Sequence, residues 1–183
     1  MMRRFFILAA LGLLAGCANP DDLGQPAPPL GDFRLGHNIV VAPKFEKGPL
    51  SREKSKAEWI AAVESRIAER FGRYEGEKLY HFGVSLEGYV LAQPGIPLVA
   101  SPKSALVLKI TVWDDAAGEK LNDTAHQIVV FEQLSGAQVI GSGLTQSAEE
   151  QLENLSKNAA KMIELWLVRQ HTRAGWFSEP PQG

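Results

Sequence analysis

Residues 79–92 alternate between apolar and polar side chains, and this stretch limits the possible fold more than any other part of the chain. Successive side chains on a β-strand point to opposite faces, so the alternation predicts a strand with one buried face and one wet face. Parallel sheets are usually covered on both faces, and the pattern therefore favours an antiparallel or mixed sheet. The apolar positions are Tyr80, Phe82, Val84, Leu86 and Val90, and the polar ones are His81, Ser85, Glu87 and Tyr89.

Four further segments have the composition of strands. Residues 105–113 repeat the alternation, and residues 38–45 contain a short β-branched run. Residues 126–134 and 137–144 flank Ser135-Gly136, which predicts a two-residue hairpin turn between two strands.

Two helices are predicted from capping boxes, in which a serine and a glutamate three residues later satisfy each other's backbone N–H groups. The boxes are Ser55–Glu58 and Ser147–Glu150, and each precedes apolar residues at helical spacing. Gly72 and Gly76 are plausible ends of the first helix. The predicted apolar faces are Trp59, Ile60, Val63, Ile67 and Phe71, then Leu152, Leu155, Ala159, Met162, Ile163 and Trp166.

The predicted order of elements is β-α-β-β-β-β-α, in one domain over residues 37–177. The most economical arrangement is an α+β fold, a mostly antiparallel five-stranded sheet with two amphipathic helices on one face. This order resembles the small α+β domains of periplasmic lipoproteins, such as the activators of penicillin-binding proteins and the curli-secretion lipoprotein family. The resemblance covers element order over residues 38–172 without a shared residue motif, so it implies no functional residues.

The N-terminal residues have the organisation of a secretory signal, with Arg3 and Arg4 before an uncharged run at 5–15. That run is too short to span a bilayer as a helix. Residues 14–17, Leu-Ala-Gly-Cys, resemble the lipobox of bacterial lipoproteins and contain the single cysteine of the chain. The resemblance implies that residues 1–16 are removed and that Cys17 carries a diacylglyceryl thioether and an acylated amine. An ordinary cleaved signal, or a twin-arginine signal beginning at Arg3, is the alternative.

Several acyl chains would hold the protein firmly at a membrane, because each buried CH₂ contributes about 0.8 kcal/mol. In lipoproteins an aspartate directly after the cysteine favours the inner membrane, whereas here the residue is Ala18. The resemblance therefore implies the outer membrane, facing the periplasm, and the inner membrane remains the alternative.

The two ends of the mature chain are predicted to lack packed structure. Residues 17–36 are rich in proline and glycine, which predicts an extended tether between the membrane and the domain. Residues 178–183 are predicted to form a disordered tail.

Charge and cysteine content argue against a nucleic-acid-binding protein and against a domain stabilised by disulfides. The chain has 19 basic and 21 acidic residues, and removal of Arg3 and Arg4 makes the mature chain more acidic still. No basic run remains to bind nucleic acid. A single cysteine permits no disulfide within the chain, so the domain must be stabilised by packing.

No catalytic motif is recognisable, so the expectation is a protein that is not an enzyme and needs no cofactor. Ser142 lies between two glycines but lacks the Gly-x-Ser-x-Gly spacing of a nucleophile elbow. Asp114, Asp115, Asp123 and His126 are candidates for a metal site if two strands bring them together. The simpler interpretation is a solvated turn, where such residues are common.

Two apolar segments are candidates for a partner surface. The loop at 93–103 is stiffened by prolines yet contains Ile96, Pro97, Leu98 and Val99, and Trp176–Phe177 follows the last helix. Either segment would instead complete the core if it folds back on the domain. The favoured function is a lipid-anchored, non-enzymatic domain that binds an envelope protein or helps assemble one. A small-ligand or lipid carrier is the alternative, followed by an envelope hydrolase.

Overall fold

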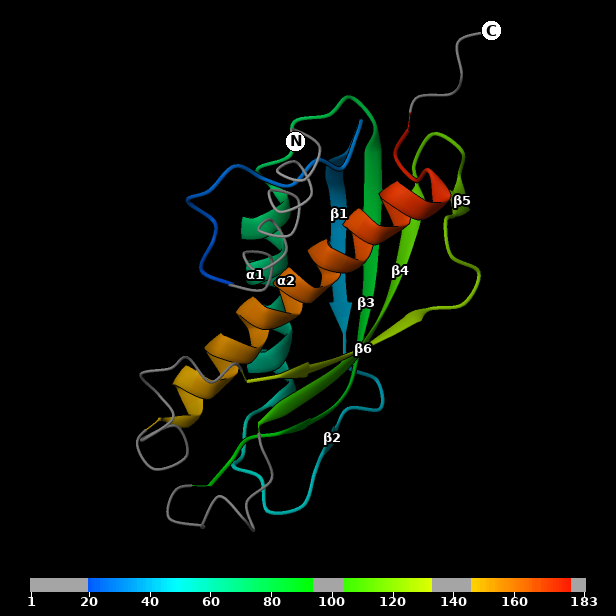
Figure 1. Ribbon diagram of the computed structural model, residues 1–183. Helices are drawn as coiled ribbons and strands as arrows, with labels where there is room; N and C mark the ends of the chain where they lie inside the picture. The colour runs from blue at the N-terminus through cyan, green and yellow to red at the C-terminus, as the bar shows by residue number, and fades with distance from the viewer. Residues whose placement is uncertain (1–19, 94–103, 133–145, 179–183) are drawn as a thin grey trace, which may run out of the picture.

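The computed structural model describes residues 20–93, 104–132 and 146–178, and it has a two-layer α+β fold (Figure 1). One open sheet forms one layer, and two helices cover one of its faces. The elements are β1 (Arg34–Val41), β2 (Glu46–Lys47), α1 (Lys56–Phe71), β3 (Leu79–Val90), β4 (Ala105–Asp114), β5 (Glu119–Lys120), β6 (His126–Phe131) and α2 (Ala148–Ala174).

The sheet is mixed and has six strands among the described residues, so the expected five-stranded, mostly antiparallel sheet needs correction. β3 pairs in parallel with β1 and β2, while β4 pairs antiparallel with β3, β5 and β6. The parallel pairing of β1 with β3 arises because α1 connects them, as in a β-α-β unit. The expected strand at 137–144 and its Ser135-Gly136 turn lie outside the described residues.

The alternating pattern of β3 is confirmed up to Leu86, with Tyr80, Phe82 and Val84 also buried. A register shift between Leu86 and Gly88 then reverses which side chains face the helices. Tyr89 therefore lies in the core, contrary to its predicted polar position.

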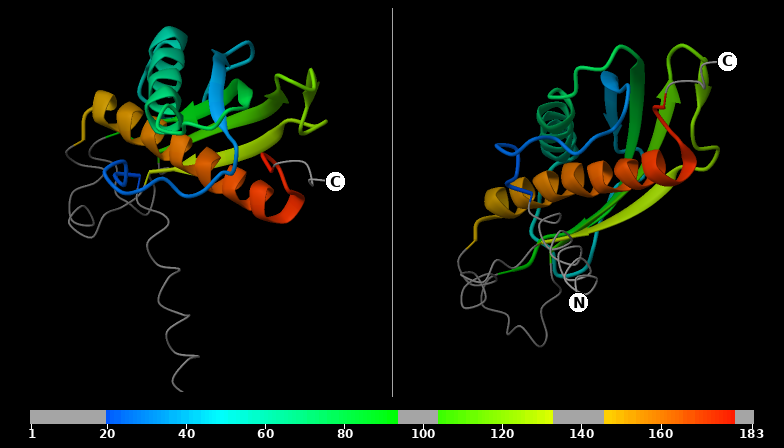
Figure 2. Two further views of the ribbon diagram at one scale, coloured as in Figure 1. Left: turned by 90° about the horizontal axis from the view of Figure 1, so that it is seen from above. Right: turned by 45° about the horizontal axis from the view of Figure 1, so that its top comes forward.

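Both capping boxes are present. The side chain of Ser55 accepts a hydrogen bond from the Glu58 backbone N–H, and that of Ser147 accepts one from the Glu150 backbone N–H. In return, each glutamate side chain accepts the backbone N–H of its serine. Lys54 contacts both Glu58 and Glu149, so the N-terminal ends of the two helices are joined. The helices cross over the same face of the sheet (Figure 2). Within the described ranges, no helix has the length and apolar character needed to cross a membrane.

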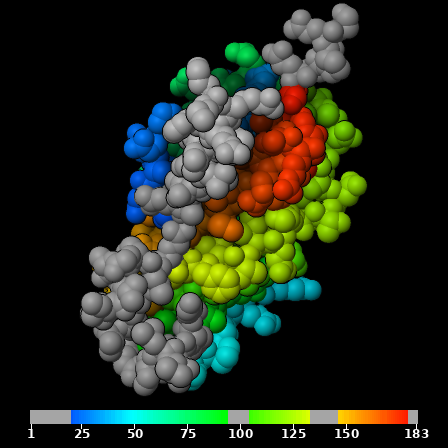
Figure 3. Space-filling view, in the orientation of Figure 1, coloured from blue at the N-terminus to red at the C-terminus, as the bar shows by residue number. Residues whose placement is uncertain are grey.

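Residues 20–33, here called the docked segment, pack on the domain, so the predicted tether over 17–36 is wrong for this part. Leu30 and Phe33 are about 1% exposed. The ring of Phe33 contacts those of Tyr80 and Phe177, among others. Burial of two large apolar side chains contributes about 1.5–3 kcal/mol each, and prolines reduce the entropy lost on docking. The domain thus begins before residue 37, and Figure 3 shows the segment, in blue, against the molecule.

Gly31 and Gly76 allow this close docking. Gly31 has a φ of +69°, and a Cβ there would lie 2.5 Å from the Phe177 carbonyl oxygen. A Cβ on Gly76 would lie 2.4 Å from the backbone nitrogen of Phe33. Both positions therefore require glycine in order to bring two backbones together.

Candidate functional site

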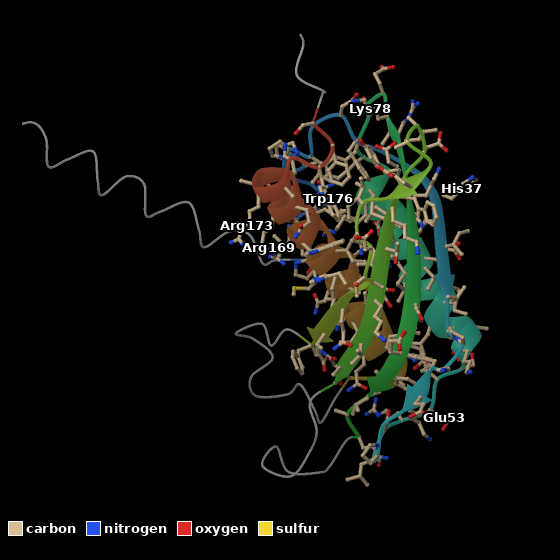
Figure 4. The ribbon with its side chains drawn as sticks, turned by 90° about the vertical axis from the view of Figure 1, so that its right-hand side faces the viewer. His37, Glu53, Lys78, Arg169, Arg173 and Trp176 are labelled. Atoms are coloured by element: carbon tan, nitrogen blue, oxygen red, sulfur yellow. The ribbon has the colours of Figure 1, made fainter. Side chains whose placement is uncertain are left out.

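The face of the sheet opposite the helices, here called the outer face, is not covered by any described element (Figures 1 and 4). Its side chains occupy the positions that alternate with the buried core positions of each strand. The outer face consists of Ile39 and Val41 of β1, His81, Gly83, Ser85 and Glu87 of β3, Ala105, Val107, Lys109, Thr111 and Trp113 of β4, and Gln127, Val129 and Phe131 of β6.

Exposed apolar side chains gather on this face. Six large apolar side chains are well exposed in the described part of the chain, and five of them belong to the outer face. Single exposed apolar residues need no explanation, but a group on one face indicates a surface that another molecule covers. The five are Ile39 (54% exposed), Val41 (45%), Trp113 (39%), Val129 (41%) and Phe131 (56%); the sixth is Leu50.

One end of the outer face is mainly apolar. Val107 of β4 lies directly opposite Val129 of β6, and Ala105 lies opposite Phe131. Side chains at opposite positions are close enough to form one continuous surface. A groove of about 480 Å³ adjoins it, lined by β2, the end of β3, Ala105 and Val107. The groove and the apolar end together form a concave, largely apolar area.

The middle of the outer face carries a small charged network. The Ser85 hydroxyl donates to Glu87 at 2.8 Å, and the Lys109 ammonium lies 3.2 Å from the same carboxylate. The Ser85 hydrogen bond and Lys109 lower the pKa of Glu87, although partial burial opposes them. Glu87 therefore stays ionised, and the face combines apolar area with oriented charge.

The other end of the outer face holds a histidine pair that the sequence did not reveal. The backbone N–H of His37 donates to His81 Nδ1 at 2.8 Å, and His81 Nε2 lies 2.9 Å from Asp115. Because Nδ1 accepts, Nε2 carries the hydrogen that Asp115 receives. Both ring nitrogens of His81 are thus engaged, which leaves neither for a metal ion. The three residues lie on separate segments, so only the strand register unites them.

The predicted metal candidates do not converge. The Asp114 carboxylate accepts the Ala117 N–H at 3.0 Å within a turn, whereas Asp115 contacts His81. His126 lies on β6 and stacks on Trp166 with ring centroids 4.5 Å apart. Asp123 is exposed between β5 and β6. No group of three or more potential ligands that could hold a metal ion occurs among residues 20–93, 104–132 and 146–178.

Of the predicted partner surface, Phe177 belongs to the core. It is 3% exposed, and its ring lies 4.7 Å from Tyr80 and 5.0 Å from Phe33. Trp176 is partly buried and packs edge-on against Trp166. These two aromatic residues therefore close the core where the docked segment meets α2. Ile96, Pro97, Leu98 and Val99 lie outside the described residues, as does Cys17.

A buried ionic cluster joins the two helices, and sequence reasoning missed it. The Glu164 carboxylate is fully buried and accepts from Arg70 at 2.9 Å, Arg73 at 2.6 Å and Lys161 at 2.9 Å. The Tyr74 hydroxyl also donates to it at 2.9 Å. Burial alone would raise the pKa of Glu164, but the contacts with the three cationic side chains outweigh it and lower this pKa. Burial, together with Glu164, raises the pKa of Tyr74.

The same cluster holds the docked segment. Asp22 lies 2.6 Å from Lys161 and 2.9 Å from Arg70. Arg70 also donates to the Pro20 carbonyl at 2.6 Å, and Arg73 donates to that of Gln25 at 3.2 Å. Arg70 and Arg73 of α1 and Lys161 of α2 thus fix the start of the domain against its helices.

Comparisons with known proteins assign no family to this chain. No family model matches it, and no curated protein matches it either. Among solved structures, a DUF330-family protein from Xanthomonas campestris matches with 12% identity, a TM-score of 0.44, and coverage of 81% of this chain and 94% of that one. A candidate lipoprotein from Caulobacter crescentus matches with 11% identity, a TM-score of 0.31 and coverage of 71% and 92%.

A minor lipoprotein from Acinetobacter baumannii matches with 12% identity, a TM-score of 0.28 and coverage of 72% and 94%. Bacterial lipoproteins are thus among the matched structures. At these identities and TM-scores, however, the matches assign no function to this chain.

Proposed function

We propose that this protein is a lipid-anchored lipoprotein of the bacterial envelope, and that its outer face binds another envelope protein without catalysing a reaction. The observation that carries the binding role is the grouping of five exposed apolar side chains on the outer face. The lipobox at residues 14–17 supports the envelope location, with Cys17 as the acylated residue and the outer membrane as the favoured site.

The chemistry of the outer face fits a protein partner. Protein interfaces combine an apolar, aromatic centre with oriented polar groups around it. The outer face has this mixture, with Phe131 and Val129 near the groove and the Ser85–Glu87–Lys109 network beside them.

A lipid or small-ligand carrier is the second candidate, and the open groove of about 480 Å³ is the observation that favours it. The space between helices and sheet is filled instead of open, because Trp59, Phe33 and Phe82 are buried there. The groove at the edge of the outer face, which Val107 helps to line, is then the candidate site of such a carrier. Binding of a fluorescent fatty acid that Val107→Asp abolishes would favour this candidate.

Cross-linking followed by affinity purification tests the proposed function. The double variant Val129→Asp and Phe131→Asp places two charges on the outer face, and we expect at least a tenfold loss of the cross-linked partner. Leu50→Asp is the matched control, since Leu50 is 60% exposed but lies in the loop before α1. We expect this control to recover the partner at the wild-type level. Equal recovery by both variants would contradict a binding role for the outer face.

Mass spectrometry of the native N-terminus tests the anchor. We expect a chain that begins at Cys17 and carries the mass of the acyl groups, recovered in the outer-membrane fraction. A chain that begins elsewhere, or has an unmodified Cys17, would contradict the proposed anchor.

A further inference from the structure

The docked segment begins at a rigid point of the domain. The Pro20 carbonyl is bound by Arg70, which is 2% exposed, and Asp22 is bound by Lys161, which is 4% exposed. Charged side chains held this deeply are fixed by their partners and have little freedom to move. The chain is therefore attached to α1 and α2 from Pro20 onward.

Cys17 and Pro20 are three positions apart, with only Ala18 and Asn19 between them. A fully extended chain spans at most about 3.6 Å per residue, so the two positions lie within about 11 Å of each other. An acylated Cys17 must therefore enter the bilayer close to the side of the molecule where α1, α2 and the docked segment lie. This surface is here called the helical side.

We infer that the domain is held directly against the bilayer, with its helical side toward the lipid headgroups and its outer face away from them. This inference rests on the proposed acylation of Cys17. The outer face lies on the opposite side of the sheet from the helices (Figures 2 and 4), so this orientation leaves it accessible to a partner in the periplasm.

The C-terminal end of α2, on the helical side, carries positive charge that suits such a surface. Arg169 and Arg173 are exposed on α2 and point away from the sheet (Figure 4). Neither forms an ion pair with another described residue. Arginine at a membrane surface attracts anionic headgroups at about 1 kcal/mol per side chain.

Energy transfer from the protein to acceptor-labelled headgroups measures this orientation. Acylation occupies the only natural cysteine, so a single introduced cysteine takes the fluorophore. Thr172→Cys labels the helical side, and Gln127→Cys labels the outer face; both positions are exposed. The full-length native lipoprotein is reconstituted in vesicles of phosphatidylethanolamine and phosphatidylglycerol. We expect transfer from position 172 to exceed that from position 127 severalfold.

Two variants separate docking from simple attachment. Asp22→Ala removes a side chain bound by Lys161 and Arg70, and we expect it to reduce the difference between the two labelled positions. Asp21→Ala is the matched control: it removes the same charge, but its side chain is largely exposed and lies 3.6 Å from Lys157, and exposed pairs contribute little, so we expect a much smaller effect. A flexible insertion after Asn19 should lower transfer from position 172 while the domain stays folded by circular dichroism.

The outcomes distinguish the inference from the proposed function. Equal transfer from positions 127 and 172 in the wild-type background, on a protein that takes one fluorophore, would overturn the orientation and leave the anchor standing. A protein that takes two fluorophores has a free Cys17 thiol and would overturn the anchor itself.

Discussion

Glu164 shows how much of the domain depends on a single side chain. Its carboxylate is fully buried and joins α1, α2 and, through the shared cations, the docked segment. An uncompensated buried charge is costly, so removing one member of such a cluster destabilises far more than removing an exposed pair. The cluster could not be predicted, because Arg70 and Glu164 are 94 residues apart and each reads as an ordinary polar position on its own helix.

Glu164→Gln should therefore lower the free energy of unfolding by about 3–5 kcal/mol, because three cations lose their shared charge. Urea denaturation at neutral pH measures the change. Glu153→Gln is the matched control on the same helix, since Glu153 is partly exposed and pairs with Arg66. Glu153→Gln should lower the free energy of unfolding by less than about 1 kcal/mol. Similar costs for the two variants would contradict the central position of Glu164.

The pH dependence of stability should arise partly from the same residue. The pKa of Glu164 is lower in the folded protein than its ordinary value of 4.5, so folding favours the ionised form. Its contribution is therefore complete above about pH 4.5 and is lost as the pH falls through the folded-state pKa. The pKa of Asp22 is also lower in the folded protein than its ordinary value of 3.8, so Asp22 changes stability with pH in the same direction. The stability gap between wild type and Glu164→Gln should narrow below pH 4.5, and a constant gap would contradict this assignment.

At the scale of elements, sequence patterns within one turn of a helix predict the structure correctly. Features that depend on contacts between distant segments cannot be predicted in this way. Both capping boxes were predicted because serine and glutamate three residues apart act within one turn. The register shift in β3 depends on pairing with β4, so the position of Tyr89 could not be read from alternation. The composition of the docked segment predicts a tether because prolines and glycines dominate it, whereas Leu30 and Phe33 provide its contacts with the core.

The second capping box should contribute measurably to stability. Ser147→Ala removes the acceptor for the Glu150 N–H, and we expect a loss of about 1 kcal/mol in thermal or urea unfolding. Ser65→Ala, at an exposed position inside α1, should be neutral or slightly stabilising, since alanine favours the helix. No loss of stability from Ser147→Ala would contradict the contribution of the cap.

The whole molecule has two different sides. Its helical side holds the start of the domain through buried charge, and its outer face groups exposed apolar residues around a groove. The α+β class and two helices could be predicted from periodicity. The sequence predicts the outer face only as the solvent-exposed side of β3. Its apolar character could not be predicted, because it comes from side chains of β1, β4 and β6 that only the folded sheet brings together. The metal candidates failed because strand register places Asp115 beside His81 and His126 beside Trp166.

Site-specific photo-cross-linking in living cells tests the binding role of the outer face most directly. A photoreactive residue at position 129 reports on the outer face, and one at position 172 reports on the helical side. We predict a discrete protein adduct from position 129 that is absent from position 172. No protein adduct from position 129, or the same adduct from both positions, would contradict the account.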